Sequence, residues 1–211
     1  MTEQMKEWSS DFGRQYTDRN PHSVEGMDEA FVGMFGVSRT ALNREFLGDM
    51  DRSIRILEVG TNVGTQLQVL QSMGFTNLYG IELQHYAVEE AKKLRRQINI
   101  IQASALDIPY KDGFFDLVFT SGVLIHISPA DLPTVMSEVH RCSRRYIWGI
   151  EYFSEKQEEV PYRGKPQLLW KGDYAKTYRD LFPGLKVIRE RMLPHVDSSN
   201  VDKMYLLEKQ S

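Results

Sequence analysis

A short loop between an apolar run and a helical segment carries the first residues whose spacing could do chemistry. Residues 58–64 read E-V-G-T-N-V-G, so that Gly60 and Gly64 flank Thr61 and Asn62. A strand that ends at Gly60, followed by a helix from about Gly64, offers free backbone N–H groups to a ligand. Glycine allows a ligand to approach closely, and asparagine adopts left-handed backbone angles more readily than most residues. The loop alone is consistent with a nucleotide-binding turn and with an ordinary tight turn.

A second acidic position favours the nucleotide-binding interpretation. Glu82 ends the apolar run Y-G-I-E-L about 20 residues after the loop, where a carboxylate accepts ribose hydroxyls in nucleotide-binding sheets. Leu83 follows it directly. Ser104, Ala105 and Leu106 follow a third apolar run, where an adenine would lie between backbone and apolar side chains. We therefore expect these residues, together with the loop, to bind an adenosine-containing cofactor.

The elements that must position these residues alternate along the chain. The predicted strands cover residues 54–59, 77–83, 98–102, 115–120, 145–150, 185–189 and 204–209. The predicted helices cover residues 65–73, 86–97, 129–142 and 174–181. This alternation predicts a doubly wound α/β fold of three layers, with parallel strands joined by crossover helices. Only the loop PHVDSSN separates the last two strands, so the last strand is expected to run antiparallel.

Two segments lie outside this alternation. Residues 1–50 precede the first strand and are expected to form a helical lid, whereas residues 51–211 form a single cofactor-binding domain. Residues 151–173 lie between the fifth strand and the last helix and supply further lid material. In a doubly wound sheet the ligand binds beyond the carboxyl ends of the strands. Both segments are therefore expected to cover that edge.

Composition narrows the possible functions. The 211 residues suit one globular domain, and a net charge of -3 argues against a nucleic-acid-binding surface. The single cysteine, Cys142, excludes an intramolecular disulfide and a multi-cysteine metal site. The basic run at residues 92–96 is expected to be the solvated end of a helix. No apolar stretch approaches the roughly 20 residues of a membrane span, and the polar N-terminus is unlike a secretory signal. We expect a cytoplasmic monomer or homodimer without a metal, membrane or nucleic-acid partner.

The loop, Glu82 and the segment after the third strand together resemble the class I S-adenosylmethionine-dependent methyltransferases. That family commonly has E/D-x-G-x-G-x-G where this chain has E-x-G-x-N-x-G. The competing dinucleotide-dependent oxidoreductases need G-x-G-x-x-G for their pyrophosphate, a spacing that residues 58–64 lack. Glu58, two residues before Gly60, also suits a cationic sulfonium and amino group better than a pyrophosphate. The resemblance implies S-adenosylmethionine as the cofactor and a Rossmann-like sheet of seven strands, the last inserted antiparallel.

Several further stretches resemble a narrower group, the pseudaminic acid biosynthesis-associated methylases. In chain order they are WSSDFGRQYTDRN (8–20), SGVLIHISPADLP (121–133), RCSRRYIWGIEYF (141–153), YRGK (162–165) and LLWKGDYAK (168–176). The resemblance implies an acceptor from sugar or cell-surface glycan metabolism. It also implies that Tyr16, Arg19, Asn20 and Ser121 belong to the cofactor site. Residues 154–157 and 200–204 depart from the group's pattern, both near the expected acceptor side.

The acceptor side offers several candidate residues, each with a purely structural alternative. His126 follows the fourth strand, where an imidazole could act as a general base or could bind backbone near a helix start. Glu151 and Tyr152 end the fifth strand, where they could orient an acceptor hydroxyl and pack against a sulfonium, respectively. Tyr162 and Arg163 precede a glycine in a turn, in which the guanidinium could bind an anionic acceptor group or remain solvated. Spacing leaves both interpretations of each residue open.

The expected reaction is in-line displacement at the methyl carbon of S-adenosylmethionine by a small-molecule acceptor. Because the cofactor carries its own leaving group, the protein mainly aligns the two partners and excludes water. Two other functions stay open. One is a cyclase or lyase that releases methylthioadenosine without an acceptor, and the other is a non-catalytic partner module with a methyltransferase fold. The intact loop and Glu82 favour an enzyme, since a scaffold needs neither.

Overall fold

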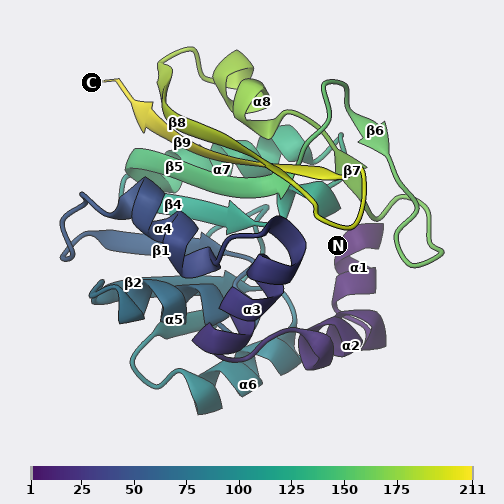
Figure 1. The fold of residues 1–211 in the computed structure, drawn as a ribbon, viewed down its shortest axis with the longest axis horizontal. Coiled ribbons are helices and arrows are strands. Elements are labelled where there is room, and N and C mark those ends of the chain that lie inside the picture. Colours follow the sequence, from purple (N-terminus) through teal and green to yellow (C-terminus); the bar gives the residue numbers. More distant parts are fainter. Residues whose placement is uncertain (1, 211) are drawn as a thin grey trace.

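The computed structural model describes residues 2–210, and a seven-stranded sheet flanked by helices forms its centre (Figure 1). The strand order in this sheet is β3-β2-β1-β4-β5-β9-β8. Its strands are β1 (Arg55–Val59), β2 (Asn77–Glu82), β3 (Asn99–Gln102), β4 (Phe115–Ser121), β5 (Ser143–Tyr152), β8 (Leu185–Pro194) and β9 (Val201–Lys209). A separate two-stranded sheet consists of β6 (Glu158–Glu159) and β7 (Trp170–Lys171).

Helices precede the first strand and then alternate with the strands. Before β1 the chain forms α1 (Glu3–Trp8), α2 (Asp11–Arg19), α3 (Val24–Phe35) and α4 (Arg39–Leu47). After β1 it forms α5 (Thr65–Ser72), α6 (His85–Leu94), the short 3-10 helix η1 (Leu124–His126), α7 (Leu132–Cys142) and α8 (Tyr174–Leu181). None of the helices within residues 2–210 combines the length and the apolar character needed to cross a membrane.

The pairing of the strands confirms the predicted topology. Strands β1 to β5 of the main sheet pair in parallel, and β9 pairs antiparallel with both β5 and β8. In the parallel register Val59 lies beside Ile81 on one side and Thr120 on the other, and Thr120 lies beside Gly149. The carboxyl ends of four parallel strands therefore meet at one edge of the sheet.

Two hydrophobic clusters cover the two faces of the sheet, as a three-layer fold requires. Alternate residues of each strand point to opposite faces, so Leu57 packs with α7 and α8 while Ile56 packs with α4, α5 and α6. Cys142 is fully buried, and Trp148 is among the largest buried side chains. Cys142 thus has the buried position expected of a small apolar residue.

Two helix boundaries differ from the sequence prediction by three residues each. The helix predicted to begin at residue 129 begins at Leu132, because Ser128 and Asp131 form a hydrogen-bonded turn before it. The helix predicted to reach residue 97 ends at Leu94, and Arg95 folds inward with its Nη2 donating to the His22 carbonyl at 2.6 Å. The basic run is therefore only partly a solvated helix end.

The C-terminal hairpin is longer than its apolar runs indicate. Strand β8 extends to Pro194 and β9 begins at Val201, and the His195 amide donates to the Asn200 carbonyl at 2.9 Å to close the turn. The prediction missed the extension of β8 because it is an edge strand, mostly exposed, in which the charged run of residues 189–191 interrupts the apolar pattern.

Candidate functional site

A cavity of about 470 Å³ lies beyond the carboxyl ends of the parallel strands. Residues that end β1, β2, β4 and β5 line it from one side, and residues of α1, α2 and α3 line it from the other. In Figure 1, α1 and α2 lie past the ends toward which the arrows of β4 and β5 point. The volume is in the range of sites for small organic ligands.

The loop after β1 has the backbone of a ligand-binding turn. Gly60 and Gly64 adopt φ angles of 72° and 75°, and Asn62 adopts the left-handed angle of 50° for which asparagine is suited. A Cβ atom at Gly60 would lie 2.6 Å from Cγ2 of Val123, so a larger residue does not fit without displacement. The Gly60 amide donates to the Ile81 carbonyl at 2.9 Å, which fixes the loop against β2.

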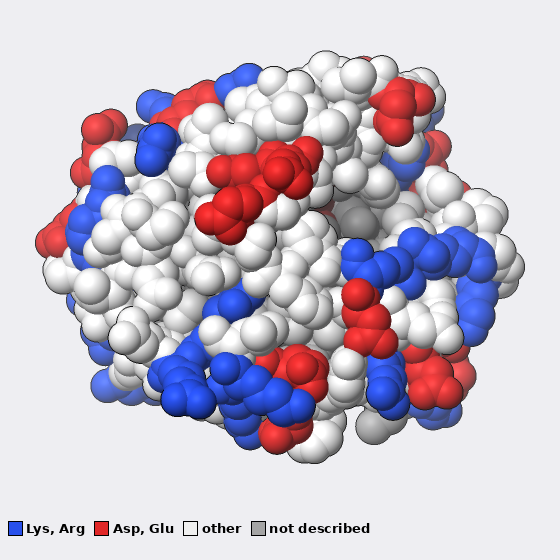
Figure 2. Space-filling model, turned by 60° about the horizontal axis from the view of Figure 1, so that its bottom comes forward, with Lys and Arg blue, Asp and Glu red and all other residues white. Residues whose placement is uncertain are grey.

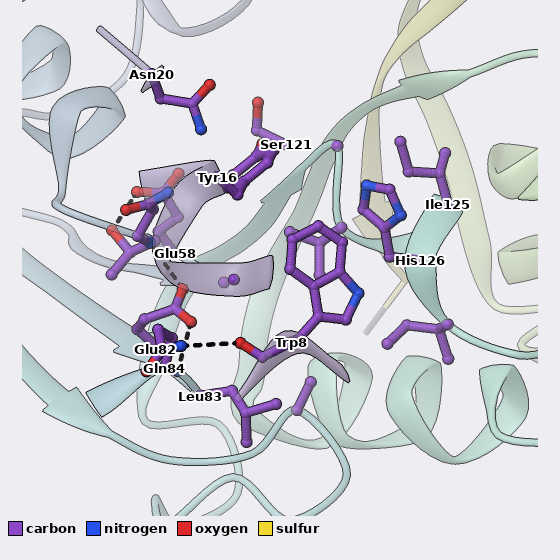
Figure 3. Close-up of a pocket in the computed structure, with 18 of the residues that line it drawn as sticks. Trp8, Tyr16, Asn20, Glu58, Glu82, Leu83, Gln84, Ser121, Ile125 and His126 are labelled. Atoms are coloured by element: carbon purple, nitrogen blue, oxygen red, sulfur yellow. Dashed lines mark hydrogen bonds between the residues drawn. The ribbon is translucent and has the colours of Figure 1, made fainter. Parts of the chain in front are cut away.

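The Glu82 carboxylate joins two segments of the cavity wall. Its Oε2 accepts from the Asn62 amide at 2.9 Å, and its Oε1 accepts from the Gln84 amide at 2.8 Å. Gln84 Nε2 donates to the Trp8 carbonyl at 3.2 Å, which ties the end of α1 to β2 (Figure 3). Burial raises the pKa of Glu82, and the backbone N–H donors oppose that rise. A carboxylate has about four acceptor sites, so Glu82 can still accept from the two hydroxyls of a ribose.

Glu58 lies on the same wall and is almost fully buried. Its Oε2 accepts from the Thr61 hydroxyl at 2.6 Å. Burial raises the pKa of Glu58 to about 8, opposed by the Thr61 hydrogen bond and by the nearby charge of Arg39. Arg39 is itself fully buried in α4, and its Nη1 donates to Ser121 Oγ at 3.3 Å. A cationic ligand group beside Glu58 would favour the ionised carboxylate, so this wall suits an ammonium or sulfonium.

Unpaired polar atoms on the cavity wall test whether the residues fit S-adenosylmethionine. Asn62 Oδ1, Gln66 Oε1 and Trp8 Nε1 are buried and have no hydrogen-bond partner within residues 2–210. Buried polar atoms are normally paired, so these atoms indicate a polar ligand. Ala105 and Leu106 supply an apolar surface on the same wall. A ligand with amine, carboxylate and hydroxyl groups at one end and an aromatic base at the other therefore fits this wall.

His126 lies on the opposite side of the cavity from the glycine loop, against the ring of Trp8 (Figure 3). The centroids of these rings are 4.6 Å apart, and the Tyr162 ring lies 5.0 Å from His126. Nδ1 of His126 lies 2.6 Å from the Leu168 carbonyl, so it carries the proton and Nε2 is free to accept. Burial lowers the pKa of His126 to about 4, so the imidazole is neutral at physiological pH.

Aromatic and charged contacts beside the cavity link the N-terminal helices to each other and to the segment between β5 and α8. Trp8 packs against Tyr16 with centroids 5.2 Å apart, and Phe12 packs against Tyr162 with centroids 6.0 Å apart. Lys165 forms an ion pair with Glu7 of α1, joining residues far apart in the sequence. The segment predicted as lid material thus contacts the N-terminal helices.

Glu151 holds the loop after β4 and does not line the cavity. Its Oε1 accepts from the Val123 amide at 3.2 Å, and its Oε2 accepts from the Ile125 amide at 3.3 Å. Burial raises the pKa of Glu151 to about 7, and the hydrogen-bond donors oppose the rise. The structure therefore gives Glu151 a structural role, whereas its neighbour Tyr152 lines the cavity. Adjacent strand residues point to opposite faces, and at this strand end only Tyr152 lies on the cavity wall.

Most of the residues singled out from the sequence lie on the cavity wall. They are Tyr16, Asn20, Glu58, Gly60, Thr61, Asn62, Glu82, Leu83, Ser104, Ala105, Leu106, Ser121, His126, Tyr152 and Tyr162. The structure places Arg19, Gly64, Glu151 and Arg163 off this wall. Arg19 is exposed, Gly64 is the N-cap of α5, and Arg163 is exposed in its turn with a φ angle of 52°. For Arg163, the solvated alternative is the one observed.

Sequence reasoning expected residues 1–50 to cover this edge but named none of the α3 residues that line the cavity. Five residues of α3 line it, spaced three and four apart: Met27, Ala30, Phe31, Met34 and Phe35. That spacing is the signature of an apolar helix face and could have been recognised. Asp202 of β9 also lines the cavity, but only the antiparallel pairing with β5 brings it there.

Comparisons with known proteins agree with this fold. Residues 57–146 match a family model described as a methyltransferase domain. An uncharacterized methyltransferase of Synechocystis sp. is 35% identical over 78 residues, which are 37% of this chain. The matched part spans 37% of that relative's length.

Solved structures extend the likeness to most of the chain. The 1,6-didemethyltoxoflavin-N1-methyltransferase of Burkholderia thailandensis, solved with S-adenosylhomocysteine bound, has a TM-score of 0.68 at 14% identity and covers 96% of this chain and 84% of its own. The cyclase SpnF has a TM-score of 0.66 at 12% identity and covers 81% and 79% of the two chains. The chain therefore has the Rossmann-like fold of class I S-adenosylmethionine-dependent methyltransferases, a fold that also occurs in a cyclase.

Proposed function

We propose that this protein is an S-adenosylmethionine-dependent methyltransferase that acts on a small molecule. The observation that carries the proposal is the Glu82 carboxylate, held by the Asn62 amide of the glycine loop and facing the same cavity. The methyltransferase-domain match over residues 57–146 includes both residues. Together they support a site for the adenosine and methionine parts of this cofactor.

Different side chains of the cavity would bind different parts of the cofactor. Glu82 would accept the ribose hydroxyls, the left-handed loop would present backbone to the methionine part, and Glu58 would face its cationic groups. S-adenosylmethionine, when bound, supplies an electrophilic methyl group and its own leaving group. Tyr16 and Trp8 line the cavity and would shield the reacting groups from water. Alignment of two reactants in this way can contribute about 7–11 kcal/mol, so we propose that positioning dominates the catalysis.

We propose that the methyl acceptor is a small molecule and that the protein has neither a nucleic acid nor a membrane as a partner. On the face shown in Figure 2, basic side chains form two separate groups, one along the right and one at the lower left, and acidic side chains lie beside each. Lys92 and Lys93 in the basic run pair with Glu89 and Glu90 at 2.8 and 2.6 Å. The resemblance to pseudaminic acid-associated methylases makes a sugar or glycan precursor the first acceptor class to test. A cytoplasmic location and a monomeric or homodimeric state complete the proposal.

Mass spectrometry of the adenosine product tests the reaction. The protein is incubated with S-adenosylmethionine alone and with N-acetylneuraminic acid or UDP-N-acetylglucosamine, and calorimetry with S-adenosylhomocysteine is run on the same preparation. Micromolar binding, about -8 kcal/mol, with S-adenosylhomocysteine as the product that an acceptor increases, supports the proposal. Methylthioadenosine formed without acceptor would instead identify a cyclase or lyase. If neither S-adenosylmethionine nor S-adenosylhomocysteine binds, the cofactor assignment is wrong and a non-catalytic partner module is the remaining alternative.

A further inference from the structure

One side of the cavity is an apolar lobe between α3 and the ends of β5 and β9. Met27, Ala30, Phe31, Met34 and Phe35 form its helical wall, and Ile150, Tyr152 and Asp202 line the strand side. The Val196 amide donates to the Met34 carbonyl at 2.9 Å, which holds the end of α3 against the β8–β9 turn. The lobe is therefore a built part of the cavity and not a gap between unconnected elements.

Asp202 is the charged group that the strands present to this lobe. Its side chain is 13% exposed, and its Oδ1 lies 2.9 Å from Nε2 of His195, which is 5% exposed. Burial raises the pKa of Asp202 to about 6, opposed by His195 and by the charges of Arg39 and Lys171. At neutral pH the Asp202 carboxylate is therefore mostly ionised, and its Oδ2 keeps lone pairs that can accept from a further donor.

We propose that this lobe binds the methyl acceptor and that the acceptor is an apolar ring carrying one hydroxyl or N–H group, which donates to Asp202. The inference rests on the proposed methyltransferase function. The apolar side chains of this lobe would leave most hydroxyls of a saccharide unpaired, which weakens its binding, so the inferred acceptor differs from the sugar precursor that the family resemblance suggests. A ring buries its apolar surface against Phe31 and Phe35 and needs one polar partner.

The proposed contact also identifies a group, the Asp202 carboxylate, that can receive the proton that the acceptor loses during methyl transfer. The acceptor oxygen or nitrogen forms a bond to the methyl carbon as the carbon–sulfur bond breaks, and the sulfur keeps that electron pair. The sulfonium charge disappears, and the acceptor's proton passes to the Asp202 carboxylate. Charge and atoms balance without another reagent. The lone pairs of Asp202 thus serve first to orient the acceptor and then to take the proton.

Binding of matched probe pairs tests the inference, with S-adenosylhomocysteine present at saturation. Phenol, indole and 2-naphthol each carry one donor, and anisole, 1-methylindole and 2-methoxynaphthalene are the same rings without it. N-acetylglucosamine is the saccharide probe, and dissociation constants come from ligand-observed NMR. A hydrogen bond to a charged group is worth about 1.5–3 kcal/mol, so at least one donor ring should bind about 10-fold tighter than its partner.

Variants show whether Asp202 and α3 cause that preference. Asp202→Leu removes the acceptor group and should abolish the 10-fold preference, whereas Asp197→Leu, at an exposed position of the neighbouring β8–β9 turn, should keep it. Ala30→Phe fills the lobe and should weaken all ring binding about 10-fold or more. Glu29→Phe places the same bulk on the opposite side of α3 and should not.

The controls separate this inference from the proposed function. Every variant is first checked for S-adenosylhomocysteine binding, which also reports whether it is folded. If the wild type binds no S-adenosylhomocysteine, the cofactor assignment fails and the inference falls with it. If it binds S-adenosylhomocysteine but no donor ring, or prefers N-acetylglucosamine, or keeps the donor preference in Asp202→Leu, only the acceptor inference is overturned.

Discussion

Replacing Gly60 with alanine tests the geometry of the glycine loop through the stability of the fold. The φ angle of 72° puts this residue in the left-handed region, which costs a non-glycine residue about 1–2 kcal/mol. The new Cβ would lie 2.6 Å from Cγ2 of Val123, and overpacking of this kind costs about 1–3 kcal/mol. Gly60→Ala should therefore lower the free energy of unfolding by about 2–5 kcal/mol, or Tm by roughly 4–20 °C.

Urea unfolding of a double-mutant cycle separates the two costs. Val123→Ala removes both Cγ atoms and leaves Val123 Cβ at an ordinary 3.5 Å from the new methyl group, so it should relieve the overpacking and not the backbone cost. The expected coupling energy between Gly60→Ala and Val123→Ala is about 1–3 kcal/mol. Gly33→Ala is the matched control, since a Cβ there meets nothing within 4 Å in a helix, and it should stabilise by about 0.5–1 kcal/mol. A Gly60→Ala protein as stable as the wild type, or a coupling near zero, would refute this reasoning.

Two further substitutions test the affinity for S-adenosylhomocysteine and the pH dependence of stability, respectively. Asn62→Gly keeps the left-handed backbone angle and loses at most one hydrogen bond to a ligand. By calorimetry, its affinity for S-adenosylhomocysteine should therefore be within about 10-fold of the wild-type affinity. A loss of about 100-fold would show that the side chain is essential. Burial lowers the pKa of His126 from 6.5 to about 4. Between these two pH values the unfolded chain binds more protons than the folded chain, so the free energy of unfolding falls as the pH is lowered from 6.5 to 4. His126→Gln should remove about 3 kcal/mol of that pH-dependent loss in urea unfolding at pH 4 and pH 7, and an unchanged pH dependence would contradict the burial argument.

The sequence predicted the features of the fold that depend on local pattern. Period-two and period-3.6 spacing identified the strands of the main sheet and the helices between them, and the loop without a helix identified the antiparallel hairpin. Boundaries were missed where side chains made long-range contacts. Arg95, for example, leaves the helix because it binds the His22 carbonyl, a residue far away in the sequence.

The side of the cavity formed by the glycine loop and β2 was easier to predict than the side formed by α3, β5 and β9. Glu82 and Asn62 lie at the ends of consecutive strands, so parallel topology alone brings them together. Glu151 and Tyr152 share a strand end, and the phase of the strand, which the sequence left open, decides which of the two faces the cavity. Asp202 reaches the cavity through antiparallel pairing, which gives no local signal of its position.

The most direct measurement of the cofactor site is calorimetry of S-adenosylhomocysteine with Glu82→Ala. Two hydrogen bonds from ribose hydroxyls to a carboxylate, at about 1.5 kcal/mol each or more, correspond to a loss of about 100-fold in affinity. Glu90→Ala, which removes an acidic side chain paired with Lys93 on α6, is the control and should bind as the wild type does. We expect no measurable binding heat from a folded Glu82→Ala protein. Affinity near that of the wild type would contradict the assignment of this cavity to S-adenosylmethionine.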